Sequence, residues 1–259
     1  MNTTGKIFWE LLKTVLIFIK QSFKDNTINL FIWATCTIFI NVYVMQKMGL
    51  PGNYGDLMVA GIIVSAIWFQ MIGTVFTNVA DFSGDRYIQY HFTLPISNTL
   101  IFIKSMCAST ISGFIAGIVG LIICKMMLFN TFILSHISIP YFIIALLLSS
   151  GFFSAFTMFL ISITKNPHEI GNAINRIIFP LWFLGGFLFP WMVLYNVMPS
   201  LAIVTLLNPY IHMTESLRVA TIGQSGFLPF WPSCAMLIFI IIILGISGIK
   251  LLKNRLDFL

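Results

Sequence analysis

Long apolar runs dominate this chain and limit the folds open to it. A run of about 20 apolar residues is long enough to cross the hydrocarbon core of a bilayer as a helix. We locate six such runs, at 28–46, 57–80, 106–128, 139–164, 176–198 and 231–252. Only 8% of the residues are charged, compared with about 25% in soluble domains. The sequence therefore predicts an all-α membrane protein with six transmembrane helices.

The placement of lysine and arginine predicts which side of the membrane each end of the chain faces. Cytoplasmic segments of membrane proteins are enriched in both residues. If the N-terminus is cytoplasmic, all but three of the 14 cations (Lys47, Lys125 and Arg218) fall on the inner side. The rule therefore favours cytoplasmic N- and C-termini. The cations are scattered at membrane edges, which argues against a nucleic-acid partner.

The segment ahead of the first run has the pattern of an amphipathic helix. In "KIFWELLKTVLIFIKQSFK" the charged residues follow one another at steps of 4, 3, 7 and 4, and therefore lie on one face. We expect an interfacial helix over 6–26, with its lysines toward anionic lipid headgroups. Two interpretations stay open: a lever that transmits a partner's motion to the bundle, and a passive anchor.

Motifs for catalysis, metal binding and nucleotide binding are missing from the sequence. It has no G-x-x-x-x-G-K-[ST] phosphate loop, no H-E-x-x-H and no G-x-S-x-G. No predicted span carries acidic residues deep in its middle, as ion-coupled carriers usually need. We predict no catalytic residue, no metal ligand and no bound cofactor, so that energy for uphill transport would come from another chain.

One polar insert, "ADFSGDRYIQYHFTLPIS" at 80–97, separates the second and third apolar runs on the predicted cytoplasmic side. Pro95 lacks an N–H and restricts the residue before it, so it can end one element and set the direction of the next. Ser97 is placed to cap the helix that enters the third span. The insert is either a docking element for a soluble partner or an amphipathic loop resting on the membrane.

Two further stretches lie around the fifth run. "FPLWFLGGFLFPWMVL" contains Gly186, Phe189 and Pro190, and "LLNPYIHMTESLR" at 206–218 contains Asn208, Pro209, Glu215 and Arg218. Together with the polar insert and the six-run layout, these stretches resemble the permease subunits of the ABC-2 type transporter family. The resemblance covers nearly the whole length of the chain.

The resemblance implies a single transmembrane domain over 1–259 that works with a separate nucleotide-binding ATPase, which binds the ATP. It implies export across a bacterial cytoplasmic (inner) membrane, with two copies, or this chain and a similar permease, forming the path. A cytoplasmic coupling loop is expected at 81–105. Its docking residues would be Asp81, Gly84, Asp85, Arg86, Thr93, Leu94, Pro95 and Ser97.

On the outer side, the segment 191–230 is too polar and too rich in proline and glycine to be a further span. Short segments at membrane depth persist only when they are buried in protein or line a cavity. We therefore expect re-entrant segments before the last span. Glu215 and Arg218 are spaced i, i+3 and can pair on a helix. With Asn208 and Pro209 they form a candidate extracytoplasmic gate; the alternative is an exposed pair on an interfacial loop.

Aromatic residues crowd the fifth run, and four of them are candidates to line a transport path: Phe179, Trp182, Phe183 and Phe187. Their rings suit sugar faces and acyl chains, whereas lipid contact is the alternative explanation. The predicted substrate is amphipathic or carbohydrate-containing. A drug or small-lipid efflux permease of the same family is the main alternative. An ion-coupled carrier or a membrane-embedded lipid-modifying enzyme would be a different class of protein.

Overall fold

The computed structural model describes residues 3–49, 54–83, 97–129, 131–164 and 166–257. These residues form helices and connections, with no strand among them. The elements, in chain order, are α1 (Thr3–Ile38), the π-helix η1 (Phe39–Val44), α2 (Met45–Lys47), α3 (Tyr54–Ser83), α5 (Asn98–Met127), the 3-10 helix η2 (Leu134–His136), α6 (Ile139–Ile163), α7 (Pro167–Ala173), the π-helix η3 (Ile174–Ile178), α8 (Phe179–Phe183), α9 (Trp191–Val197), α10 (Pro199–Thr205), α11 (Pro209–Thr221) and α12 (Phe230–Asp257). The predicted all-helical class is confirmed.

Within the described ranges, five helices are long and apolar enough to cross a membrane. They cover Phe23–Lys47, Tyr54–Asp81, Thr99–Met127, Ile139–Ile163 and Phe230–Asn254. Each coincides with one of the predicted runs. The sixth span, expected at 176–198, is not confirmed, because that range is divided among η3, α8, an irregular turn and α9.

The local sequence explains why the fifth run does not form one long helix. Helical structure continues through Pro180 to the end of α8 at Phe183, and Pro190, which lacks an N–H, stands immediately before α9. Between them, Gly186 has a φ of 71°, a left-handed conformation that glycine adopts without steric cost. We call residues 184–191 the hinge turn. It changes the direction of the chain between α8 and α9.

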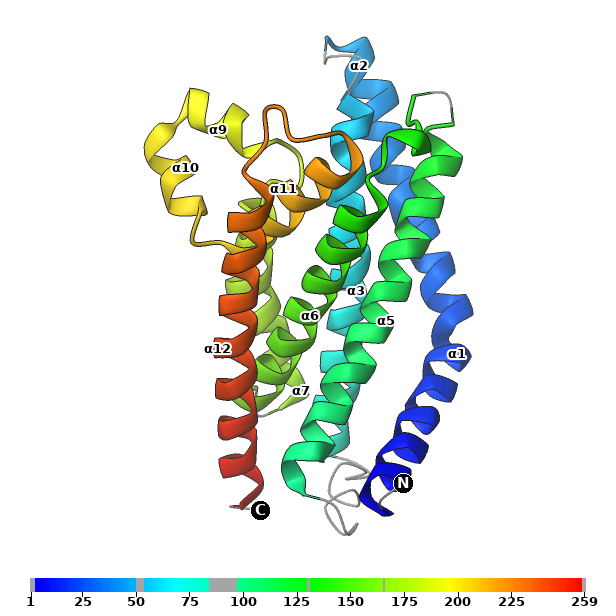
Figure 1. Cartoon of the computed structure of the whole chain (residues 1–259), viewed down its shortest axis with the longest axis vertical. Helices are drawn as coiled ribbons and strands as arrows, with labels where there is room; N and C mark the ends of the chain where they lie inside the picture. Colours follow the sequence, from blue (N-terminus) through cyan, green and yellow to red (C-terminus); the bar gives the residue numbers. More distant parts are fainter. Residues whose placement is uncertain (1–2, 50–53, 84–96, 130, 165, 258–259) are drawn as a thin grey trace.

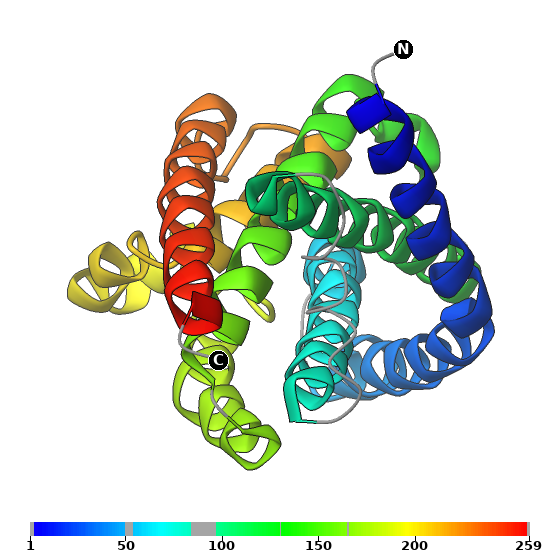
Figure 2. The ribbon, with the colours of Figure 1, turned by 90° about the horizontal axis from the view of Figure 1, so that it is seen from below.

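The separate interfacial helix expected over 6–26 is likewise not confirmed. α1 continues from Thr3 to Ile38 without a break, so the charged N-terminal segment and the first span are parts of one helix. Lys13 and Glu10 form an exposed ion pair of 2.7 Å on it. Seen from below, α1 follows an arc around α3 and α5 (Figure 2).

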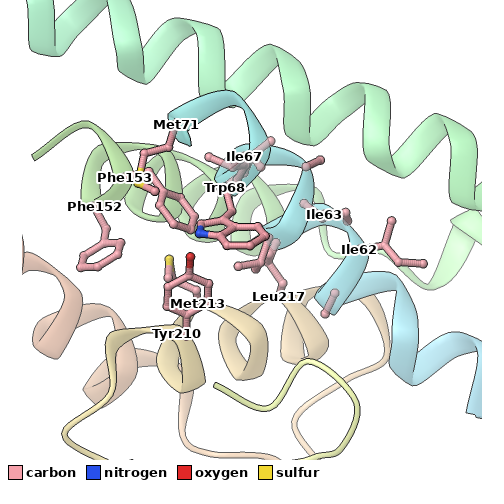
Figure 3. Close-up of a cluster of buried hydrophobic side chains, with 14 of the residues drawn as sticks. Ile62, Ile63, Ile67, Trp68, Met71, Phe152, Phe153, Tyr210, Met213 and Leu217 are labelled. Atoms are coloured by element: carbon pink, nitrogen blue, oxygen red, sulfur yellow. The ribbon is translucent and has the colours of Figure 1, made fainter. Parts of the chain in front are cut away.

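The core lies where α3, α6 and α11 meet. Figure 3 shows Trp68 of α3, Phe153 of α6 and Tyr210 of α11 in one cluster. The Phe153 and Tyr210 rings are 5.3 Å apart at an interplanar angle of 77°. All three side chains are buried. Aromatic burial of this kind fixes α11 against the two long helices.

The ends of the chain and the short helices α2, α9 and α10 lie at opposite ends of the bundle (Figure 1). The labelled N- and C-termini mark one end, close to α7. The connection 45–49, α9 and α10 lie toward the other end. The arrangement separates the charged termini from the region that the sequence assigns to the outer side.

Candidate functional site

α11 begins with a side-chain cap that also ties it to α8. Asn208 Oδ1 accepts a hydrogen bond from the Tyr210 backbone N–H at 3.0 Å, and Pro209 follows at the first helical position. Both choices are typical of helix starts. The Asn208 Nδ2 group donates to the Leu181 carbonyl at 2.7 Å. One side chain therefore positions α11 relative to the end of α8.

All 13 residues of α11 are buried. The helix packs against α3, α6 and α12. Its sequence, "PYIHMTESLRVAT", is nevertheless polar. A polar group that leaves water needs a hydrogen-bond partner, and a buried charge needs a paired countercharge. The partners of Glu215 and Arg218 therefore define what α11 holds in place.

Glu215 and Arg218 form a fully buried ion pair. Arg218 Nη1 donates to Glu215 Oε1 at 2.8 Å, and both side chains are 0% exposed. Residues spaced i, i+3 lie on the same side of a helix, so the two side chains of α11 can pair. The alternative of an exposed interfacial pair does not describe this arrangement.

Arg218 also binds backbone carbonyls from two other parts of the chain. Its Nε donates to Leu57 at the start of α3 at 3.2 Å, and its Nη1 donates to Phe189 at 3.2 Å. Its Nη2 donates to Gly186. The last two carbonyls belong to the hinge turn. The planar guanidinium has donors for several acceptors at once, which an ammonium group cannot match geometrically.

Glu215 connects the hinge turn to the segment before α12. Its Oε1 accepts from the Trp191 backbone N–H at 3.0 Å, and its Oε2 accepts from the Leu228 backbone N–H at 3.1 Å. The Thr214 hydroxyl donates to the Gly185 carbonyl at 2.8 Å. Thus α11 holds both ends of the hinge turn and the segment leading into the last span.

Burial and charge act in opposite directions on Arg218. Removal from water lowers the pKa of its guanidinium, whereas the Glu215 carboxylate beside it raises the pKa. The paired carboxylate compensates the charge of the arginine at this depth. The charged form of Arg218 is therefore stabilised by the Glu215 carboxylate at this buried position.

Three of the four aromatic residues proposed to line a path lie on α8, and the fourth, Phe187, belongs to the hinge turn. Trp182 stacks on Trp68 of α3, with centroids 5.4 Å apart, and on Phe187, at 4.6 Å. Its indole N–H donates to Ser65 Oγ at 2.9 Å. Phe187 is buried, whereas Phe183 is 56% exposed, and Phe179 contacts Trp182. The set links the hinge turn to α3.

Most of the predicted coupling loop lies outside the described residues, namely Gly84, Asp85, Arg86, Thr93, Leu94 and Pro95. Asp81 belongs to the last turns of α3. Ser97 occupies the N-cap position of α5, but its side chain makes no capping hydrogen bond. Ser97 therefore stands at the start of the helix as predicted, but the predicted capping hydrogen bond is wrong.

The sequence did not point to several contributors to this site. Leu57 and Trp191 act through backbone groups, which carry no residue-type signal; Phe189 also acts through its backbone, although it is among the residues named in the quoted stretch. The hydroxyl of Tyr54 donates to the Leu188 carbonyl at 2.6 Å, adding a further bond to the hinge turn. Gly186, with its positive φ, was part of the quoted "LGGF" stretch, and the glycine pair was the available signal.

A family model described as ABC-2 type transporter matches residues 8–222. The chain belongs to the ABC-2 type transporter family. The matched range includes four of the five long apolar helices and all of α11. No curated protein and no solved structure matches the chain at a significant level. As an ABC-2 type transporter, the chain is a multi-pass membrane protein and a permease component of a transport system.

Proposed function

We propose that this chain is the permease subunit of an ATP-driven exporter, working with a separate ATPase. The observation that carries the proposal is the match to the ABC-2 type transporter family over residues 8–222. Two copies, or this chain and a similar permease, form the path in a bacterial inner membrane. Both termini face the cytoplasm in this proposal. Their position together at one end of the bundle supports that orientation (Figure 1).

We propose that α11 and the hinge turn close the outer end of the path. The Glu215–Arg218 pair holds backbone groups of the hinge turn and of the segment before α12. A movement of the long helices that separates these groups would expose a buried ion pair, which favours two discrete states over gradual loosening. The gate residues are Asn208, Pro209, Glu215 and Arg218.

We propose that the substrate is amphipathic or carbohydrate-containing. Phe183 is more than half exposed and lies beside Phe179 and Trp182. In a pair of protomers, these rings would supply an aromatic surface to a shared path. Such a surface suits both sugar faces and hydrocarbon chains. A drug or small-lipid efflux permease would use the same surface.

The test is capture of the ATPase encoded nearest to this chain by the tagged, detergent-solubilised permease. We expect a stable complex, and we expect the triple change Asp85→Ala, Arg86→Ala and Leu94→Ala to reduce capture at least tenfold. The control triple change is Lys47→Ala, Met48→Ala and Ser135→Ala, at exposed positions in two other interhelical connections. It should leave capture intact. Failure to capture any candidate ATPase would contradict the proposed function, whereas capture that survives the first change would move the contact elsewhere.

A further inference from the structure

A cavity of about 360 Å³ lies between α1, α3 and α5. Its lining comes from residues 23–33 of α1, 66–73 of α3 and 112–119 of α5. On α3 and α5 these positions are close to the middle of the spans. Figure 2 shows α1 bowed away from α3 and α5 in this part of the fold. The cavity is therefore at membrane depth and within a single copy of the chain, and no residue of the hinge turn lines it.

Uncharged polar side chains line this cavity. Asn26 Nδ2 donates to Gln70 Oε1 at 3.0 Å, which links α1 to α3. Asn29, which is exposed at the mouth of the cavity, and the buried Ser112 also line it, and neither side chain has a hydrogen-bond partner among the residues that the structure describes. Ser112 is only 7% exposed. A buried polar group without a partner is costly at membrane depth, so the Ser112 hydroxyl favours a ligand that offers it a hydrogen bond.

The remaining wall is aromatic and aliphatic. Trp33 of α1 and Phe69 of α3 meet edge to face with centroids 4.9 Å apart. Trp33 also lies 6.0 Å from Phe187 of the hinge turn. Aromatic faces accept both hydrocarbon and the C–H faces of sugars or polyols. Trp33 therefore connects the cavity to the hinge turn, which belongs to the proposed closure.

Among the residues that the structure describes, those lining the cavity include no Asp, Glu, Lys, Arg or His. An ionic headgroup entering here would lose its hydration without meeting a countercharge, which costs several kcal/mol per ion. A neutral headgroup with hydroxyl or amide groups would instead satisfy Asn29 and Ser112. The volume is within the range of about 300–1,000 Å³ typical of small-molecule sites.

We propose that this cavity binds an amphiphile with an uncharged, hydroxyl- or amide-bearing head and a hydrocarbon tail. Asn26, Asn29, Gln70 and Ser112 recognise the head, and Trp33 and Phe69 contact its apolar faces. The inference rests on the proposed function in one respect: it names the substrate class that the permease would accept before transport. Binding itself requires neither the ATPase nor a second copy.

The experiment is photo-crosslinking of the full chain in phosphatidylcholine nanodiscs, with peptides identified by mass spectrometry. The probe is decyl glucoside carrying a diazirine in its chain, and the comparison probe is decyl phosphate with the same diazirine. We expect the glucoside to label 23–33, 66–73 and 112–119 at least fivefold more than the phosphate does. Equal labelling by the two probes, or labelling elsewhere only, would overturn the proposal.

A cavity-filling variant tests the same site independently. A Cβ added at Gly73 meets no atom within 4 Å, so Gly73→Leu can enter the cavity without displacing backbone. We expect it to reduce glucoside labelling at least fivefold, and Asn29→Leu to reduce it similarly. Gly171→Leu is the control, since a Cβ at Gly171 also meets nothing within 4 Å and that residue lies in α7. Unchanged labelling in both test variants would overturn the site.

Competition distinguishes binding of a whole amphiphile from binding of its sugar head alone. Excess unlabelled decyl glucoside should abolish labelling; if excess free glucose also does so, the head alone is bound. Competition by neither compound would contradict a specific site. Because this assay contains no ATPase, failed ATPase capture would leave its result standing, and failed labelling would leave the proposed permease function standing.

Discussion

Replacing Arg218 by methionine is expected to lower the free energy of unfolding by about 3–5 kcal/mol, the range for a buried ion pair that loses one partner. Glu215 would stay 0% exposed without its countercharge. The carbonyls of Leu57, Gly186 and Phe189 would also lose their donor. Denaturant titration in mixed micelles, followed by tryptophan fluorescence, measures the change.

Two further variants distinguish loss of the pair from loss of volume. Arg218→Lys keeps the charge but not the planar fork, and should cost less than Arg218→Met. The double change Glu215→Leu with Arg218→Met should cost less than the sum of the two single changes, because neither charge remains unpaired. Additive costs would show that the two charges do not stabilise each other.

Substitution of Gly61 by alanine is expected to destabilise the protein by about 1–3 kcal/mol through overpacking. A Cβ at this position of α3 would lie 2.6 Å from the Phe187 carbonyl oxygen and 2.7 Å from Phe187 Cδ2. The backbone of the hinge turn would have to move away from α3. The same denaturant titration reports the loss.

Gly73 provides the matched control on the same helix. A Cβ there has no neighbour within 4 Å, so Gly73→Ala adds no clash. It should be neutral or stabilising by up to about 1 kcal/mol, since alanine favours the helix over glycine. Equal destabilisation by the two changes would show that close approach of the hinge turn to α3 is not the cause.

Five spans were predictable because hydropathy alone determines them: no competing structure satisfies the backbone of 20 apolar residues in lipid. The run at 176–198 is also apolar, but its helical part ends with α8, and Gly186 and Pro190 occupy the turn that follows. Proline and glycine are tolerated in many transmembrane helices, so their presence did not distinguish a kink from a turn. The structure shows a turn there.

The candidate site was predictable only in part. The i, i+3 spacing of Glu215 and Arg218 allowed an ion pair, but its burial depends on distant partners. Arg218 meets Leu57, which is 161 residues away along the chain. A polar sequence such as that of α11 is typical of a surface helix. Its burial results from the packing of α3, α6 and α12 around it, which the sequence of α11 does not indicate. The polar cavity was missed because Asn26, Asn29 and Gln70 come together only across two helices.

We propose that ATP turnover by a partner ATPase opens the closure formed by α11 and the hinge turn. Thr214→Cys tests it, because the Thr214 side chain is 1% exposed and its hydroxyl binds the Gly185 carbonyl. Cys36, Cys107, Cys124 and Cys234 are first replaced by serine or alanine. The measurement is labelling by a membrane-impermeant maleimide in proteoliposomes containing the captured ATPase. We predict slow labelling without nucleotide and at least tenfold faster labelling during ATP hydrolysis. A labelling rate that ATP leaves unchanged would contradict ATP-driven opening of this closure.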